Sequence, residues 1–419
     1  MDRLRPASLS VIIPALDEEA SIARVVKRVL ALRPHLQARG LAGPEVIVVD
    51  DGSRDGTVAA VRAVGGVELV RHPENRGYGA ALKTGLARAT GDLVAFLDAD
   101  GTYPPEQLPD LCAVALDGAD LVIGSRMHAA ATGMPTTRRI GNRLFAGLVT
   151  LLGERRVSDC ASGMRVVRRD VLRRLYPLPD GLNFTPIMSL RAIHEGLDMA
   201  EVCIPYAERT GQSKLRVAAD GVRYLGSILW TTLSYSPVRV LGMVGVAGVA
   251  VAAAIGAGLV TMRAAGITTL GPWGIAAVFA ALVSGVAGVS VFALGVLFNY
   301  LVTLFRQQPT RVGLFGRPIF DPPLERHFRW MGIVTGSAGV GIAAVALTLG
   351  LRGWDVARLW LYLVGSALFI LVGVQLVISW VLVAILDDLS QREARSGADL
   401  AGQARPGPSE AASRAAERP

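Results

Sequence analysis

Hydrophobic and polar residues are distributed differently before and after about residue 235. Before that point, short apolar runs alternate with amphipathic stretches, a pattern that predicts βαβ units around a mainly parallel sheet. After it, long apolar runs follow one another up to about residue 386. We therefore expect an α/β domain over residues 1–235, an all-α membrane domain over 236–386 and a disordered cytoplasmic tail over 387–419.

The strands expected in the first domain are short apolar runs that end at a turn or a polar cluster. They are Leu9–Ala15, Val46–Val49, Val67–Val70, Asp92–Leu97, Leu121–Ile123 and Met164–Val167. Helices are expected between the first four strands, one ending near Arg33 and the others covering Asp55–Val64 and Arg76–Ala89. In sheets of this kind, ligands bind beyond the carboxyl ends of the strands.

Four apolar segments of the second domain are long enough to span a bilayer. They cover about residues 240–262, 274–305, 331–351 and 359–386, and each reaches the ~20 residues that a spanning helix needs. Their interiors contain no Asp, Glu, Lys or Arg, which argues against an ion or proton pathway. Gly, Ala and Ser are frequent, as in helices that pack closely in lipid.

Arginine placement predicts how these helices are oriented. The segment between the second and third helices carries Arg306, Arg311, Arg317, Arg326 and Arg329, whereas the loops at the opposite end carry Arg263, Arg352 and Arg358. Positively charged loops stay in the cytoplasm, so residues 306–330 are expected there. With an even number of spans, the first domain and the tail lie there too, in an integral protein of a bacterial-type cytoplasmic membrane.

Two further segments bear on membrane association. Leu215–Leu233 mixes large apolar residues with Arg216 and Arg223, which fits either an amphipathic interfacial helix or the last core helix of the first domain. The tail from Gln391 to Pro419 is rich in Ala, Arg, Gly, Pro and Glu without periodicity, which is typical of disorder.

The composition agrees with a membrane protein. Hydrophobic residues make up 51% of the 419-residue chain, more than an ordinary soluble enzyme needs. The net charge of +8 comes without a Lys-rich tract, so it indicates a membrane surface and phosphates and not nucleic acid. Three widely spaced cysteines give no disulfide framework, which suits a reducing compartment. The first residues contain no apolar core of a signal peptide.

The clearest candidate for chemistry is the segment VAFLDADGTYPP, residues 94–105. A buried apolar run ends there in Asp98-Ala99-Asp100, and Gly101 and the two prolines stop the strand. Two carboxylates held close together repel each other, and a divalent cation relieves that cost. Mg2+ is commonly held by one or two carboxylates together with substrate phosphates. A solvated turn is the alternative when this segment is considered alone.

Polar clusters follow three other predicted strands as well. PALDE begins at Pro14, DDGS at Asp50 and GSR at Gly124. A dinucleotide-binding fold would need a Gly-rich turn after its first strand, but PALDE contains no glycine. Its carboxylates would repel a phosphate and could instead accept hydrogen bonds from a ribose or a base. The phosphates of a nucleotide would then be neutralised at Asp98 and Asp100.

Six motifs, in order along residues 8–235, resemble glycosyltransferase family 2. They are PALDEEASI, VIVVDDGSRDGT, GDLVAFLDADGTYPPE, VIGSR, DCASGMRVVRR and ERTGQSKL. The similarity is to the dolichyl- and polyprenyl-phosphate sugar synthases within that family. It implies a GT-A-type catalytic domain, a GDP- or UDP-linked sugar donor, Mg2+ or Mn2+, and a polyprenyl phosphate acceptor in the membrane.

The resemblance also assigns roles to individual residues. It implies a nucleoside pocket lined by Pro14, Leu16, Glu18, Val49 and Asp51, and a metal and diphosphate site at Asp98, Ala99 and Asp100. It further implies that Arg126, Arg209 and Lys214 act on phosphates during catalysis, together with Asp100. Arg presents a planar fork that matches phosphate, and Lys a mobile point charge.

The sequence departs from the family pattern at two places. Thr102 stands where a stronger metal ligand is common, so we expect it to be a weak ligand that acts through water. Thr185-Pro186-Ile187-Met188 stands where acidic residues are frequent. Asp159, Ser162 and Arg165 could line a sugar or acceptor pocket, or Asp159 could simply cap the segment before the strand. His72, His128 and His194 have neither metal nor triad spacing and are expected to be structural.

The expected reaction is metal-dependent, inverting transfer of a sugar onto the phosphate of the lipid. That acceptor is already an anion, so no strong general base is needed. A processive polysaccharide synthase is one alternative, although its Q-x-x-R-W segment is matched only by Arg326-His327-Phe328-Arg329-Trp330, with Arg in place of Gln. A non-catalytic transporter or lipid-binding membrane protein is the other.

Overall fold

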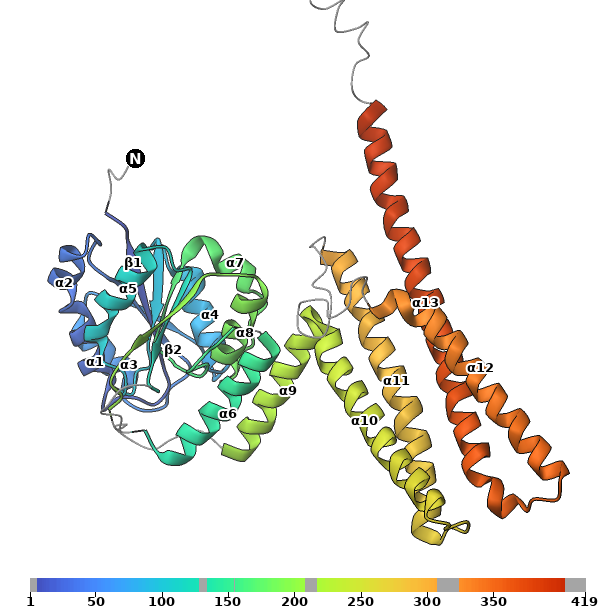
Figure 1. Ribbon diagram of the computed structural model, residues 1–419. Helices are drawn as coiled ribbons and strands as arrows, with labels where there is room; N and C mark the ends of the chain where they lie inside the picture. The colour runs from blue at the N-terminus through green and yellow to red at the C-terminus, as the bar shows by residue number, and fades with distance from the viewer. Residues whose placement is uncertain (1–5, 128–133, 154, 208–216, 307–323, 404–419) are drawn as a thin grey trace, which may run out of the picture. The chain divides into compact units, whose positions relative to one another are not determined.

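The computed structural model describes residues 6–127, 134–153, 155–207, 217–306 and 324–403 (Figure 1). The chain divides into two compact units, Met1–Thr232 and Leu233–Pro419, and each is described by itself. The first unit is the α/β domain, and the second is helical.

A single sheet organises the described part of the first unit. Its strands are β1 (Leu9–Ala15), β2 (Glu45–Asp50), β3 (Glu68–Arg71), β4 (Leu93–Phe96), β5 (Leu121–Ser125), β6 (Arg165–Arg168) and β7 (Met199–Cys203). Their order across the sheet is β3-β2-β1-β4-β6-β5-β7. Every pairing is parallel except those of β6, which runs antiparallel to β4 and β5. The prediction of a mainly parallel sheet is confirmed.

Strand directions bring the ends of four strands and the loop before β6 to one edge of the sheet. The strands β1, β2 and β4 are mutually parallel, and β5 points the same way because β6 is antiparallel to both of its neighbours. Arg165, the first residue of β6, pairs with Phe96, the last residue of β4. The loop before β6 therefore reaches the edge at which β1, β2, β4 and β5 end.

Helices cover both faces of the sheet (Figure 1). They are α1 (Ile22–Leu30), α2 (Arg33–Ala38), α3 (Thr57–Val64), α4 (Tyr78–Arg88), α5 (Leu108–Leu116), α6 (Thr136–Gly153), α7 (Leu172–Leu175), α8 (Phe184–His194) and α9 (Val217–Tyr235), with short 3-10 turns η1 (Pro105–Gln107) and η2 (Arg169–Val171).

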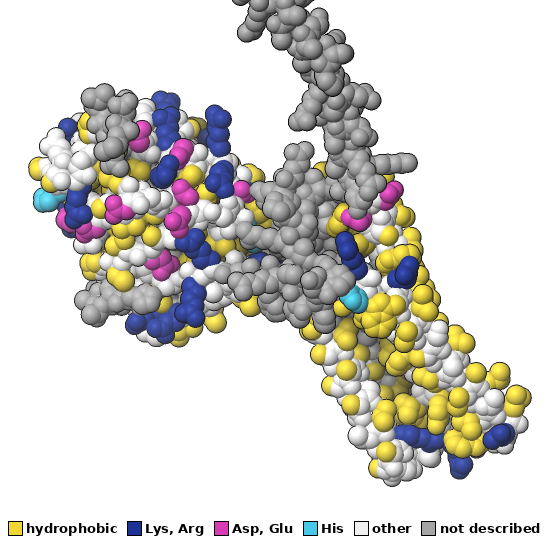
Figure 2. Space-filling view, turned by 45° about the horizontal axis from the view of Figure 1, so that its top comes forward, with side chains coloured by type: hydrophobic (Ala, Val, Ile, Leu, Met, Phe, Trp, Pro, Cys, Tyr) yellow, Lys and Arg dark blue, Asp and Glu magenta, His cyan; other side chains and the backbone are white. Residues whose placement is uncertain are grey.

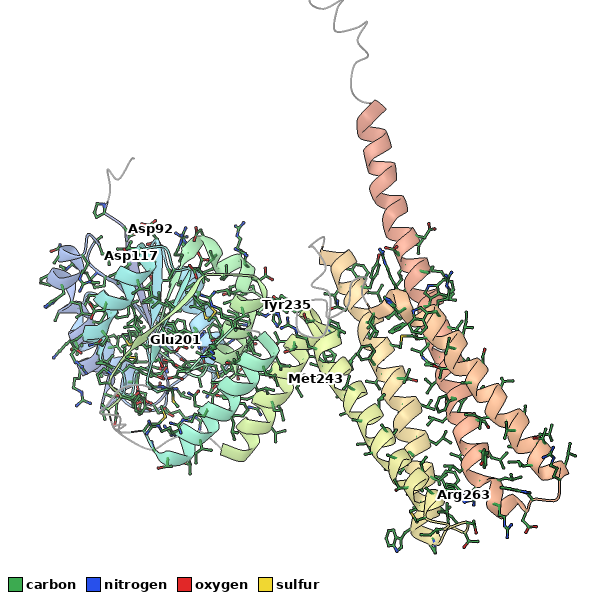
Figure 3. All side chains as sticks on the ribbon, in the orientation of Figure 1. Asp92, Asp117, Glu201, Tyr235, Met243 and Arg263 are labelled. Atoms are coloured by element: carbon green, nitrogen blue, oxygen red, sulfur yellow. The ribbon has the colours of Figure 1, made fainter. Side chains whose placement is uncertain are left out.

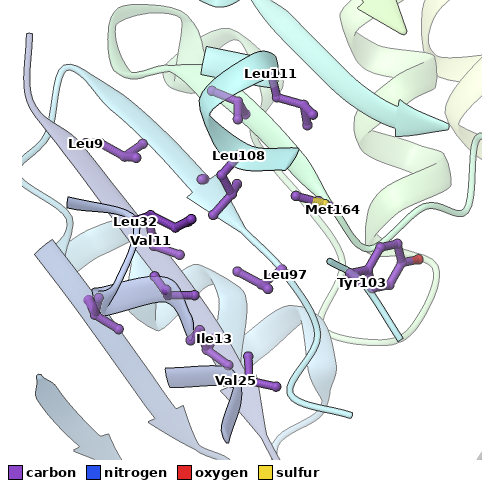
Figure 4. Close-up of a cluster of buried hydrophobic side chains, with 14 of the residues drawn as sticks. Leu9, Val11, Ile13, Val25, Leu32, Leu97, Tyr103, Leu108, Leu111 and Met164 are labelled. Atoms are coloured by element: carbon purple, nitrogen blue, oxygen red, sulfur yellow. The ribbon is translucent and has the colours of Figure 1, made fainter. Parts of the chain in front are cut away.

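Successive side chains of β1 point to opposite faces of the sheet, so they join two different hydrophobic layers. Val11 and Ile13 join the core that α1 and α5 cover, which Figure 4 shows with Val25 and Leu108. Ile12 points to the other face, where it lies directly against α4. β1 is accordingly buried along its whole length, as expected of a central strand.

The structure corrects the expected elements in detail. The helix expected to end near Arg33 forms as α1 and ends at Leu30, and a second helix that was not expected, α2, begins at Arg33. The sequence did not predict β7, because Met199–Cys203 is only partly buried and lacks a strong apolar run. The strand expected at Met164–Val167 forms as β6 one residue later, but no pattern indicated that it would be antiparallel.

α9 coincides with the segment for which an interfacial or a core helix was expected. Ile228 is fully buried, and Ser227 accepts a hydrogen bond from Asn183 (2.7 Å). Val222 and Trp230 are 73% and 74% exposed. The helix is thus amphipathic: one side packs on the first unit, and large apolar side chains stand on the other.

The second unit consists, in its described part, of α10 (Pro237–Ala264), α11 (Pro272–Arg306), α12 (Leu324–Leu351) and α13 (Val356–Gln403). Each contains a stretch long and apolar enough to cross a membrane, which confirms the four predicted segments. Figure 2 shows hydrophobic side chains over much of this unit's visible face, whereas charged side chains are mixed in on the first unit. Arg263, labelled in Figure 3, lies in the last turn of α10.

Glycines allow the helices of this unit to pack backbone against backbone. α10 packs along α11, and α12 along α13. A Cβ atom added to Gly373 would lie 2.5 Å from the backbone nitrogen of Gly336, and one added to Gly288 would lie 2.8 Å from the carbonyl oxygen of Gly245. Such close approach is how helices associate in lipid, where the hydrophobic effect does not hold them together.

The predicted disordered tail requires a correction over its first part. α13 continues without a break to Gln403, so residues 391–403 are helical. Extending an existing helix avoids the unfavourable nucleation step, and the Ala, Glu, Arg and Gln of this segment favour helix. Residues 404–419 lie outside the described residues.

Candidate active site

The candidate site is built on the turns that follow β1, β2, β4 and β5. The turn after β1 is tied to the turn after β2 by hydrogen bonds: the Asp17 amide donates to Ser53 Oγ (2.9 Å), the Arg54 amide to Asp17 Oδ1 (2.8 Å) and the Glu18 amide to Thr57 Oγ1 (2.8 Å). Asp17 has a φ of 48°, an uncommon conformation for a residue with a side chain. These bonds hold the two turns as one rigid surface.

The five residues expected in a nucleoside pocket are all at this edge, but with different exposure. Leu16 and Glu18 are half-buried, and Glu18 also accepts a hydrogen bond from Ser21 Oγ (3.1 Å). Pro14 and Val49 are buried within β1 and β2. Only backbone atoms or the neighbouring turn residues would therefore meet a ligand at those two positions.

Asp51 has a structural environment that its sequence motif did not indicate. It is 3% exposed, and its carboxylate accepts bonds from the Arg76 and Gly77 amides (both 2.9 Å) and from His72 Nδ1 (2.7 Å). His72 also bonds to Thr84 Oγ1 (2.9 Å), which agrees with the structural role expected for it. Asp51 thus holds the loop that leads into α4.

The carboxylates of Asp98 and Asp100 lie in the turn that follows β4. Asp98 is half-buried, and its Oδ1 accepts a hydrogen bond from the Tyr78 hydroxyl (2.8 Å). Asp100 is 8% exposed, and its Oδ1 accepts bonds from the Thr102 amide (3.0 Å) and hydroxyl (2.6 Å). Thr102 therefore orients Asp100 by donating to it, a different contact from the metal ligation expected of it.

Arg126, at the end of β5, forms a buried ion pair with Asp159. Its Nε and Nη2 donate to the two carboxylate oxygens at 2.7 Å each, and its amide donates to Asp159 Oδ2. The Asp159 side chain is fully buried and that of Arg126 is 11% exposed. The guanidinium also lies over the rings of Tyr103 and Tyr206, 5.6 and 5.3 Å from their centroids.

Charge pairing outweighs burial at Asp159. Burial raises the pKa of this carboxyl group. The charge and hydrogen bonds of Arg126 lower the pKa by more than burial raises it, so the pKa of Asp159 lies below its usual value. The positive charge of Arg126 is thus already compensated by the protein. In this structure it holds together β5, the loop before β6 and the two tyrosines.

Asp159, Ser162 and Arg165, for which a sugar or acceptor pocket was one of the alternatives, are all fully buried. Ser162 Oγ donates to the Gly124 carbonyl (2.6 Å). Arg165 donates to the carbonyls of Cys160 (2.7 Å) and Ser162 (3.1 Å) and to Ser189. Polar residue types alone could not distinguish a pocket lining from a loop held by buried hydrogen bonds.

The unusual segment Thr185–Met188 lies in α8 and is buried throughout. Arg209 and Lys214 lie outside the described residues, as does His128. The described chain reaches Ala207, whose amide donates to the Thr102 carbonyl (3.0 Å). Ala207 is therefore held at the turn that carries Asp98 and Asp100, two residues before Arg209.

The residues present fit a divalent cation such as Mg2+ or Mn2+. Asp98 and Asp100 offer hard carboxylate oxygens at one turn, as these ions prefer. Within the described ranges, no group of three or more His, Cys, Asp or Glu residues forms a complete cage. A cation here would need further oxygens from substrate phosphates or water, which is how Mg2+ is usually bound.

Several residues at this edge were missed by the sequence analysis. Tyr78, Tyr103 and Tyr206 contact Asp98 or Arg126 from three separate segments. Arg24 of α1 lies beside Gly101, where an added Cβ would be 3.4 Å from its Nη2. Tyr103 lies within the segment VAFLDADGTYPP, but Arg24, Tyr78 and Tyr206 stand in no pattern that marks a site. The only sequence signal near them is the Asp98-Ala99-Asp100 turn after β4, which they surround in the structure.

Comparison with known proteins gives two family matches. Residues 10–176 match the model described as glycosyl transferase family 2, and residues 237–397 match a domain of unknown function, DUF8752. The dolichyl-phosphate hexose transferase of Haloferax volcanii is 32% identical over 221 residues, which cover 53% of this chain and 92% of that protein.

Two further relatives extend the comparison. An undecaprenyl-phosphate 4-deoxy-4-formamido-L-arabinose transferase of Aeromonas hydrophila is 30% identical over 318 residues, 73% of this chain and 92% of that protein. The low-salt glycan biosynthesis hexosyltransferase Agl6 of Haloferax volcanii is 32% identical over 232 residues, and the match spans 54% of its length. The chain belongs to glycosyltransferase family 2, and it is a glycosyltransferase with a GT-A-like catalytic domain.

The buried Arg126–Asp159 pair predicts an acid-sensitive contribution to stability. Because the pKa of Asp159 is lowered on folding, the contribution is present above its unfolded value of about 3.9 and is lost as the pH falls through the lower folded value. Asp159→Asn should cost about 3–5 kcal/mol of unfolding free energy at neutral pH, because Arg126 loses its counter-charge. The wild type should then lose stability more steeply than the variant below about pH 4.

Thermal unfolding of the detergent-solubilised protein between about pH 3 and pH 7 would measure both effects. Asp198→Asn is the control, since Asp198 pairs with Arg155 at the surface and is 72% exposed. If the wild type and Asp159→Asn lost stability equally steeply as the pH fell below about 4, the stabilising role of the Arg126–Asp159 pair would be contradicted.

Proposed function

We propose that this protein transfers a sugar from a nucleoside diphosphate sugar to the phosphate of a membrane polyprenyl phosphate. The observation that carries the proposal is the pair of carboxylates after β4, at a sheet edge shared with the turns after β1, β2 and β5. Relatives that match over 92% of their length are named as transferases to dolichyl or undecaprenyl phosphate. The four membrane-capable helices support a lipid acceptor.

The proposed reaction exchanges one C–O bond for another. An oxygen of the lipid phosphate attacks the anomeric carbon of the donor sugar, and the bond from that carbon to the nucleoside diphosphate breaks. The bonding electrons leave with the diphosphate. Attack from the side opposite the leaving group inverts the anomeric configuration, through a transition state of oxocarbenium character.

Negative charge on the leaving diphosphate is the main electrostatic demand of this reaction. A divalent cation at Asp98 and Asp100 would neutralise that charge. Thr102 and Tyr78 donate to these carboxylates and so orient them before the donor arrives. The acceptor phosphate is already ionised at neutral pH, so no side chain has to remove a proton from it.

The cations for the acceptor phosphate are proposed to come from Arg209 and Lys214. One described cation at the edge, Arg126, is compensated by Asp159 and packed between two tyrosine rings. Ala207 is anchored at the turn after β4, and Arg209 follows two residues later. We propose that Arg126 contributes by keeping this anchor in place.

The exposed apolar side of α9 supports a lipid-facing role for that helix. Val222, Leu225 and Trp230 are 73%, 43% and 74% exposed, although the opposite side packs on the first unit. An amphipathic helix of this kind lies in the interface plane with its apolar side chains in the acyl region. We propose that it does so immediately before the first membrane helix, α10.

Orientation is proposed from the arginines between the second and third helices. They support a cytoplasmic location for residues 306–330 and for the catalytic unit, on the side where nucleotide sugars are made. Labelling of a cysteine introduced at Gly313 by an impermeant thiol reagent, added to intact cells, would contradict this orientation.

The proposed activity can be tested with purified protein, a short-chain polyprenyl phosphate and a panel of labelled GDP- and UDP-sugars. Label that moves into the organic phase for one donor, and only when the lipid phosphate is present, supports the proposal. High-mass polymer would indicate a processive synthase instead. No incorporation from any donor would reject transfer to this acceptor.

Asp100→Asn should reduce transfer about a hundredfold or more while the protein remains folded and membrane-inserted, because one cation ligand loses its charge. Initial rates would be measured at saturating Mg2+ or Mn2+. Asp117→Asn is the matched control, since Asp117 follows α5 at the surface (Figure 3). Near-wild-type rates for Asp100→Asn, or full wild-type activity in EDTA, would refute the metal assignment.

Arg209→Ala should leave nucleotide affinity within a fewfold but reduce transfer on the order of a hundredfold, because a charge-assisted phosphate contact contributes about 1.5–3 kcal/mol. Arg209→Lys should restore little, since the planar fork is lost. Calorimetry and transfer assays on the same preparations would separate the two effects, with exposed Arg62→Ala as control. Equal losses of binding and transfer would assign Arg209 to the donor.

A further inference from the structure

Tyr78 connects the start of α4 to the first aspartate of the candidate metal site. Its hydroxyl donates to Asp98 Oδ1 at 2.8 Å, a normal hydrogen-bond length between two oxygens. The tyrosine is half-buried and is the first residue of α4. The proposed reaction does not otherwise need it, so its contact with Asp98 calls for a physical explanation.

The backbone of Tyr78 is fixed from two directions. On one side, Asp51 accepts the amide hydrogen of Gly77 (2.9 Å), the residue before Tyr78. On the other, the Ala80 amide donates to the Asp180 carbonyl (3.1 Å). Gly77 has a φ of 105° and lies so close to Asp180 that a Cβ would be 2.5 Å from the same carbonyl oxygen. These contacts fix the position of the Tyr78 backbone, from which its side chain reaches Asp98.

Asp98 is confined on its other side by Gly163, in the loop before β6. A Cβ added to Gly163 would lie 2.5 and 2.7 Å from the two carboxylate oxygens of Asp98. Gly163 is itself held, because its amide donates to the Tyr103 hydroxyl (2.7 Å). The carboxylate thus lies between the hydroxyl of Tyr78 and the backbone of Gly163, with little freedom to rotate.

We propose that Tyr78 is a positioning residue that holds the Asp98 carboxylate in the orientation required to bind the divalent cation of the donor diphosphate. This inference rests on the proposed function. A group that bonds to a metal ligand fixes the direction of that ligand and removes part of the entropy cost of binding the ion.

The direct test removes the hydroxyl and measures cation binding without any transfer. Tyr78→Phe keeps the ring and loses only the hydrogen bond to Asp98. Free Mn2+ would be followed by electron paramagnetic resonance during titration of the protein with GDP or UDP, in the absence of acceptor. We expect Mn2+ affinity to fall about tenfold or more, the usual effect of removing a partner of a metal ligand.

A double-mutant cycle shows whether the effect passes through Asp98. If it does, Tyr78→Phe combined with Asp98→Asn should weaken Mn2+ binding no more than Asp98→Asn alone. In transfer assays, saturating Mn2+ should restore the maximal rate of Tyr78→Phe to within about twofold of wild type, because only metal occupancy is impaired. Tyr176→Phe, at a tyrosine that is 39% exposed, should change neither quantity.

Three results would overturn the inference. They are Mn2+ affinity within twofold of wild type, additive effects in the cycle, and a maximal rate that saturating Mn2+ does not restore. Because Mn2+ binding is measured without lipid, failure to find the acceptor would leave this test intact. Failure of wild-type protein to bind Mn2+ with either nucleotide would instead remove the metal site on which both proposals depend.

Discussion

Electrostatic repulsion between two carboxylates at one turn is the constraint around which the catalytic unit is arranged. Asp98 and Asp100 follow the central strand β4, and each receives a hydrogen bond from a side chain that limits its movement, Tyr78 in one case and Thr102 in the other. Under the proposed function, a cation and a diphosphate bound at this turn would relieve the repulsion between the two carboxylates. The surrounding loops, tied to each other by hydrogen bonds, maintain this arrangement of the carboxylates.

The distribution of positive charge follows from the same constraint. The Arg126 guanidinium is compensated by Asp159 and packed against Tyr103 and Tyr206. It therefore organises β5, the loop before β6 and the chain that leads to Ala207. We propose that Arg209, which follows that anchor in the sequence, supplies a cation to the acceptor phosphate. In this proposal Arg126 has a structural role, and Arg209 provides the positive charge for the substrate.

The sequence predicted the elements that carry strong local signals. Buried apolar runs gave β1, β2, β4 and β5, and uninterrupted hydrophobic segments gave the four membrane-capable helices. The antiparallel direction of β6 and the presence of the partly buried β7 were not predictable, because strand direction and edge pairing depend on contacts distant in sequence. The same limit applied to the site. Ser162 and Arg165 suggested a pocket but are buried in loop hydrogen bonds, whereas Tyr78 carried no signal because its partner Asp98 is 20 residues away.

The central claim is that Asp98 and Asp100 hold a divalent cation against the diphosphate of a nucleotide sugar. The most direct measurement is a structure of the protein with Mn2+ and the nucleoside diphosphate of its donor, in which anomalous scattering locates the manganese. The account predicts a manganese ion about 2.1 Å from a carboxylate oxygen of Asp100 or Asp98 and in contact with diphosphate oxygens. Manganese located elsewhere, or diphosphate bound at this edge with no metal beside either aspartate, would contradict it.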